Sequence, residues 1–113
     1  MNQRINKILF DIIDSINSIN DYIKDNKDFN YYQNNKLIRR AVERELEIIG
    51  EAVNRILKIE PKIQISNARK IVDARNWVIH GYDKVDDVLV WGIIIKYLPK
   101  LKAEVDAIIK NFN

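Results

Sequence analysis

The sequence predicts an all-α protein, an antiparallel bundle of about five helices that forms a single domain over residues 1–113. Apolar residues recur at spacings of three and four along most of the chain, which places them on one face of a helix. The 113 residues include only three Gly and two Pro, whereas an all-β fold of this length needs more turn-forming residues.

The first two long helices are predicted over residues 3–24 and 36–59. The first carries a stripe of isoleucines at helical spacing, namely Ile5, Ile8, Ile12, Ile16, Ile19 and Ile23. The second has the same kind of stripe, formed by Ile38, Val42, Leu46, Ile49, Val53 and Ile56. Pro61 is expected to end the second helix, because the residue before a proline disfavours helical backbone.

The segment between these helices, KDNKDFNYYQNN at residues 24–35, breaks the apolar pattern. It is rich in Asn and Asp, so we expect a loop with short turns. Phe29, Tyr31 and Tyr32 are expected to anchor this loop to the body of the domain.

The remaining three helices follow from capping residues and proline. The third is expected to begin near Ser66 or Asn67, which are good N-cap residues, and to stop at Gly81. The fourth should begin near residues 86–87, where two aspartates suit the N-cap and the first turn. Pro99 should separate it, by a break or a sharp kink, from a fifth helix.

Composition excludes several kinds of protein. The chain has no Cys, which excludes a disulfide scaffold, a zinc–thiolate site and a cysteine nucleophile. With one His, a structural zinc site within a single chain is not expected, and we expect no metal site and no cofactor. No run reaches the ~18 apolar residues of a membrane span, and Asp11 and Asp14 interrupt the N-terminal apolar stretch, so we expect a cytoplasmic protein. The net charge of +3 is compatible with a polyanionic partner.

The stretch RNWVIHGY, residues 75–82, contains the single histidine of the chain, His80. Arg75 lies five positions before it, so at ~100° per residue the two side chains are about 140° apart around an ideal helix. Asn76 and His80, four residues apart, share one face. Trp77 and Val78 can then face the core while the polar residues line a groove.

These residue types suit metal-free cleavage of RNA. Arg75 can clamp a phosphate, His80 can exchange a proton near neutral pH, and Asn76 can orient the imidazole. The ribose 2′-OH would attack the adjacent phosphate while cations stabilise the crowded intermediate. Such cleavage is helped by both an acid and a base, and two chains would supply two histidines, so the single histidine of this chain favours a symmetric dimer with Arg75 and His80 of each subunit facing a shared cleft.

Ordinary structural roles remain open at each of these positions. A histidine next to Gly81 is often a helix cap that interacts with the helix dipole. Tyr82 by itself is typical of a half-buried aromatic residue at the edge of the core. Glu47 and Glu51 are typical of a solvated helix face, and as a like-charge i, i+4 pair they weaken the helix slightly.

The surrounding residues resemble a known family more specifically than this spacing does. The pattern R-N-x3-H-x-Y, followed by V-D and a tryptophan, resembles the C-terminal motif of HEPN-domain proteins of the HepT type, and is formed here by Arg75, Asn76, His80, Tyr82, Val85, Asp86 and Trp91. The upstream helix at residues 41–56 and LPKL at residues 98–101 are also similar to the family. The connection at residues 24–35 keeps the Asp-Phe pair of the family but lacks its Gly.

The resemblance implies an all-α HEPN bundle that forms a homodimer and acts as the toxin of a type VII-like toxin–antitoxin module. Its activity would be metal-independent endoribonuclease, with Arg75 and His80 as the essential pair and Asn76 in support. Tyr82 matches the tyrosine that the partner, a minimal nucleotidyltransferase antitoxin, modifies with AMP. The alternative reading is a non-catalytic helical subunit that docks this nucleotidyltransferase and presents its substrate.

Overall fold

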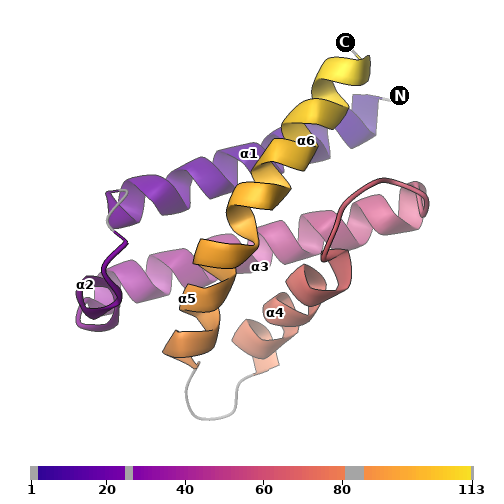
Figure 1. Cartoon of the computed structure of the whole chain (residues 1–113). Coiled ribbons are helices and arrows are strands. Elements are labelled where there is room, and N and C mark those ends of the chain that lie inside the picture. Colours follow the sequence, from indigo (N-terminus) through magenta and orange to yellow (C-terminus); the bar gives the residue numbers. More distant parts are fainter. Residues whose placement is uncertain (1–2, 25–26, 81–85, 113) are drawn as a thin grey trace.

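The computed structural model describes residues 3–24, 27–80 and 86–112, with the backbone alone at residues 77–80 and 112. Helices are the only regular secondary structure in the described residues, which contain no strand, and this confirms the predicted fold class (Figure 1). Its six helices are α1 (Gln3–Ile23), α2 (Phe29–Gln33), α3 (Lys36–Ile59), α4 (Ala68–His80), α5 (Asp87–Lys96) and α6 (Leu98–Phe112). None of these described helices is long and apolar enough to cross a membrane.

The two long helices form the base of the bundle. α1 and α3 run antiparallel and contact each other along their length, and α4 returns along α3 (Figure 1). α6 crosses α1, and α5 continues the line of α6 (Figure 1). All six isoleucines of the predicted α1 stripe are buried, and the predicted α3 stripe is buried except for the half-buried Ile38.

The segment between α1 and α3 differs from the expected loop, because it contains the short helix α2. Asp28 acts as its N-cap, and the carboxylate accepts a hydrogen bond of 2.9 Å from the backbone N–H of Asn30. This local side-chain bond satisfies one of the free N–H groups of the first turn, which is enough to start a helix of one turn.

An aromatic cluster joins α2 to α5. Tyr32 is completely buried, and its ring centroid lies 5.2 Å from that of Trp91. Phe29 lies 6.0 Å from the same tryptophan ring, and Tyr31 is only half-buried. Phe29 and Tyr32 therefore anchor this segment as predicted. The pKa of Tyr32 is raised well above its usual range, first by burial and then by nearby carboxylates, including that of Glu43.

The helix boundaries follow capping chemistry. Asp86 is the N-cap of α5, as predicted, and its carboxylate accepts hydrogen bonds from the backbone N–H groups of Val88 and Leu89. α3 ends one residue before Glu60, which confirms the effect expected of the following proline. α5 and α6 are separated at Tyr97, so that Pro99 falls in the first turn of α6, where a missing N–H costs little.

α4 begins directly after its two predicted N-cap residues, and the carbonyl oxygen of Asn67 accepts a hydrogen bond of 3.0 Å from the backbone N–H of Ile71. α4 begins at Ala68, and Asn67 has a φ of 59°, which is left-handed backbone and not the extended backbone of an N-cap. The backbone N–H of Ser66 donates to the carboxylate of Glu104 on α6. The predicted stop residue, Gly81, lies outside the described residues.

Candidate functional site

The candidate site forms where α4 crosses α3. Gly50 of α3 is buried there, directly against the side chain of Arg75 of α4. A Cβ atom placed on Gly50 would lie 2.3 Å from Cβ and 3.0 Å from Cγ of Arg75, and 3.3 Å from the carbonyl oxygen of Ile71. Atoms do not approach this closely, so the crossing requires glycine at this position.

Arg75 is held by an ion pair with the next residue of α3. Its Nη1 atom lies 2.5 Å from Oε2 of Glu51. The Arg75 side chain is 21% exposed and that of Glu51 is 53% exposed, so the pair lies at the edge of the domain with the carboxylate toward solvent. The Nε atom of Arg75 is buried without a hydrogen-bond partner among the described residues. Among the described residues, the ion pair with Glu51 is therefore the contact that orients the guanidinium group.

Arg75 forms part of the wall of a pocket of about 310 Å³ between α1, α3 and α4. The lining includes three arginines and three carboxylates, and consists of Ile8, Asp11, Arg44, Glu47, Ile48, Glu51, Ala52, Arg55 and Arg75. Its volume and polar rim can accept part of a nucleotide, with guanidinium groups available to phosphate oxygens.

Ion pairs neutralise most of the charge in this pocket. Arg44 lies 3.0 Å from Glu47, in the same way that Arg75 is paired with Glu51. Asp11 is paired with Lys7, at 2.6 Å, outside the lining. Arg55 is exposed and forms no ion pair with any described residue. The lining in one chain therefore has three arginines against three carboxylates and no net charge, and Arg55 is its cation that forms no ion pair with a described residue.

The predicted site residues are described to different extents. Arg75 and Asn76 both lie on α4 and are half-buried. His80 is the last residue of α4, and its backbone places it one helical turn beyond Asn76, but its side chain lies outside the described residues. Tyr82 lies entirely outside them. The side chains of Trp77 and Val78, which were expected to face the core, are outside them as well.

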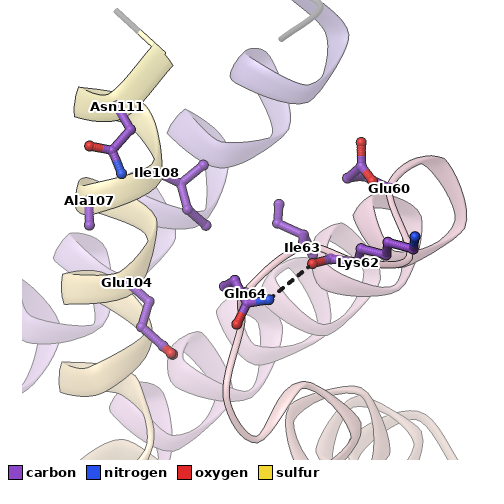
Figure 2. Close-up of a pocket in the computed structure, with 8 residues that line it drawn as sticks. All are labelled: Glu60, Lys62, Ile63, Gln64, Glu104, Ala107, Ile108 and Asn111. Atoms are coloured by element: carbon purple, nitrogen blue, oxygen red, sulfur yellow. Dashed lines mark hydrogen bonds between the residues drawn. The ribbon is translucent and has the colours of Figure 1, made fainter.

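A larger pocket, of about 480 Å³, lies between α6 and the segment that follows α3, as Figure 2 shows. Ile63, Ala107 and Ile108 form its apolar wall, and Lys62 is its one cation against the two carboxylates of Glu60 and Glu104 (Figure 2). This charge does not suit a phosphate backbone. Among the described residues, no three His, Cys, Asp or Glu side chains gather into a group that could hold a metal ion.

Two residues that shape the site were not identified from the sequence. Glu51 was expected on a solvated helix face, and although it is exposed, its carboxylate binds Arg75. Gly50 lies within a long helix, where glycine lowers stability by about 1 kcal/mol relative to alanine. A glycine inside a long helix indicates that another element packs closely against it, and this was the local signal for Gly50 in the sequence.

Comparison with known proteins identifies the family. The sequence model of the family described as "Ribonuclease HepT-like" matches residues 12–108. The chain is 39% identical over 106 residues to "Putative RNase MJ1380" of Methanocaldococcus jannaschii, which covers 92% of this chain and 95% of that protein. It is 37% identical over 108 residues to "Putative RNase MJ0125" of the same organism, covering 95% and 92%. No solved structure matches the chain. The chain belongs to the ribonuclease HepT-like family.

Proposed function

We propose that this protein is a metal-independent endoribonuclease and the toxin of a type VII-like toxin–antitoxin module, acting on RNA in the cytoplasm. The observation that carries the proposal is the held guanidinium of Arg75 at the wall of a pocket, within a chain of the ribonuclease HepT-like family. Relatives with matching lengths are named as RNases, which supports the same activity.

The proposed reaction is an internal transfer at phosphorus. A base removes the proton of the ribose 2′-OH, the 2′ oxygen forms a bond to phosphorus, and the bond from phosphorus to the 5′ oxygen breaks. An acid then returns a proton to that 5′ oxygen. We assign the proton transfers to His80 and the stabilisation of charge on the phosphate oxygens to Arg75, with Asn76 in a supporting role.

The single histidine requires a second chain for this scheme, so we propose a homodimer with a shared cleft. One His80 would serve as the base and the other as the acid. A monomer with full nuclease activity would contradict this part of the proposal.

We propose that Tyr82 is the site of control by a partner, a minimal nucleotidyltransferase that acts as the antitoxin. The partner would transfer AMP from ATP to the phenolic oxygen of Tyr82, which forms an O–P bond to the α-phosphate, loses its proton and releases pyrophosphate. The adduct adds a bulky group with a negative charge two residues after His80. RNA would then be excluded both by volume and by repulsion of its phosphates. The Tyr82→Phe variant should cleave RNA and carry no AMP after incubation with the partner, whereas an adduct on this variant would show another acceptor.

The first experiment is RNA cleavage by the purified protein in excess EDTA, with wild type beside His80→Ala. Mass spectrometry should first show that Tyr82 is unmodified, so that inactivity cannot come from the adduct. We expect the wild type to cleave RNA and His80→Ala to have lost activity while it unfolds at the same temperature. Dependence of cleavage on added Mg²⁺ would contradict a metal-independent reaction.

A second function is supported by the Arg75–Glu51 pair, because a guanidinium whose charge is already balanced is less available to a phosphate. In this alternative the protein is a helical docking subunit that binds the nucleotidyltransferase and positions its substrate. Exposed apolar residues on α5, Val88 and Ile95, would suit such an interface. If unmodified wild type fails to cleave RNA but binds the partner, and Arg75→Ala binds equally well, this alternative is the correct one.

A further inference from the structure

We propose that Glu51 is a positioning residue for Arg75, and that Gly50 and Glu51 together form a seat on α3 that holds the arginine for RNA cleavage. This inference rests on the ribonuclease function proposed above. The two residues are consecutive, yet they act on different parts of the same side chain: Gly50 meets the Cβ and Cγ atoms, and Glu51 meets the guanidinium group.

The first part of the seat fixes where the arginine side chain begins. Because Gly50 has no Cβ, the stem of Arg75 lies against the backbone of α3. A long side chain in water samples many rotamers, and fixing them costs up to about 2 kcal/mol. Close packing of the stem removes much of that freedom before RNA binds.

The second part of the seat fixes the direction of the guanidinium plane. Nη1 donates to Oε2 of Glu51 at 2.5 Å, and no described residue accepts a hydrogen bond from Nη2 of Arg75. The planar guanidinium has donors on several edges, so a bond to one nitrogen leaves another free for a phosphate oxygen. The pair therefore orients the cation while leaving a donor for the substrate.

Because Glu51 is exposed, its effect on the position of Arg75 can be measured apart from its effect on the stability of the protein. A half-exposed ion pair contributes little to folding, with typical values from about 0 to 1 kcal/mol. Glu47, one turn earlier on α3, provides a matched control for stability and for the mobility of Arg75, because it pairs with Arg44 and is not the ion-pair partner of Arg75. The two glutamates should therefore have similar effects on stability and different effects on the mobility of Arg75.

The charge of Glu51 permits an opposite hypothesis, in which it only restrains the arginine by neutralising it. Removal of a restraining carboxylate would strengthen RNA binding and raise activity, because the pocket would gain net positive charge. Removal of a positioning carboxylate should lower kcat, since misplacement of a catalytic group by about 1 Å can cost on the order of 100-fold in rate. The two hypotheses predict opposite changes in kcat.

The test measures kcat and KM for a short RNA with wild type, Glu51→Ala, Glu51→Gln and Asp14→Ala, which removes an exposed carboxylate of α1 outside the pocket lining. We expect Glu51→Ala to lower kcat by about 10- to 100-fold with KM unchanged or lower. Glu51→Gln keeps a carbonyl oxygen that can accept from Arg75 and should restore much of kcat, while Asp14→Ala should match the wild type. Unchanged or raised kcat in Glu51→Ala, or equal loss in both Glu51 variants, would overturn the proposal.

A readout that does not need activity separates this proposal from the ribonuclease function. NMR of the arginine guanidinium groups in the full chain should show restricted rotation for Arg75 in wild type and Glu47→Ala, and free rotation in Glu51→Ala. Wild type that cleaves no RNA but shows this pattern would refute the ribonuclease function and leave the seat intact. Equal mobility of Arg75 in all variants would refute the seat, whatever the activity.

Discussion

The Cα atom of Gly50 faces the side chain of Arg75 so closely that any Cβ there would lie 2.3 Å from the Cβ of the arginine. The separation between α3 and α4 is therefore determined at a residue without a side chain, next to the residue that binds the guanidinium group. Packing of the helices and orientation of the proposed phosphate clamp depend on the same two positions.

Replacement of Gly50 by Ala should destabilise the protein and lower RNA cleavage. The added methyl group overpacks the helix crossing, and overpacking of this kind typically costs about 1–3 kcal/mol, which exceeds the gain in helix propensity of about 1 kcal/mol. Chemical denaturation and cleavage assays would measure the two effects. Gly92→Ala is the matched control, because a Cβ on that helical glycine meets nothing within 4 Å and should stabilise the protein.

Removal of the unpaired cation at Arg55 should weaken RNA binding without changing the fold. Arg55→Gln deletes one positive charge from the pocket wall. RNA affinity falls as salt rises, and the slope of log affinity against log salt concentration should be smaller in the variant by roughly one, the value for one lost phosphate contact. Titrations of RNA at several salt concentrations with a catalytically inactive background would show it. Lys58→Gln, an exposed cation on α3 outside the pocket lining, controls for net charge, and an equal effect of both variants would argue against a role specific to the pocket.

Loss of the Tyr32 hydroxyl should have little effect on stability at neutral pH and should reduce the loss of stability at alkaline pH. The hydroxyl is buried without a described hydrogen-bond partner, so Tyr32→Phe should leave the free energy of unfolding unchanged or raise it by up to about 1 kcal/mol. Burial raises the pKa of Tyr32 in the folded state, so above pH 10 the unfolded chain ionises first and the wild type loses stability.

Thermal unfolding of wild type and Tyr32→Phe between pH 8 and pH 11 would therefore diverge, with the variant losing less stability as the pH rises. Tyr31→Phe removes a hydroxyl from the adjacent, half-buried residue and serves as the control. If stability falls with pH in the same way in wild type and Tyr32→Phe, folding does not raise the pKa of Tyr32.

Asp86 should stabilise the start of α5, although it lies within the sequence motif that resembles the family. Its carboxylate accepts from two backbone N–H groups of the first turn, so Asp86→Ala should cost about 0.5–2 kcal/mol. Asp86→Asn should retain most of that stability, because an amide oxygen also caps well. Equal loss of stability in both variants would indicate that the negative charge, and not the hydrogen bonding, is what α5 requires.

The sequence determined the elements of the fold because helix formation is local. Isoleucine stripes at spacings of three and four predicted the buried faces of α1 and α3, and Asp86 and Pro99 predicted boundaries that the structure confirms. The short helix α2 was missed, because its single turn is too brief to show a periodicity and depends on one cap at Asp28. The single-domain organisation and the roles of His80 and Tyr82 remain predictions.

The candidate site could be predicted from the sequence only in part. Arg75 was identified by its residue type, its position in the motif and the family resemblance, and all of these are properties of one segment. The seat formed by Gly50 and Glu51 was decided by the tertiary structure, because those residues lie on another helix, 24 positions before Arg75 in the case of Glu51. Which residues meet across two helices depends on the angle and distance at which their side chains pack, and no local pattern in either helix contains that information.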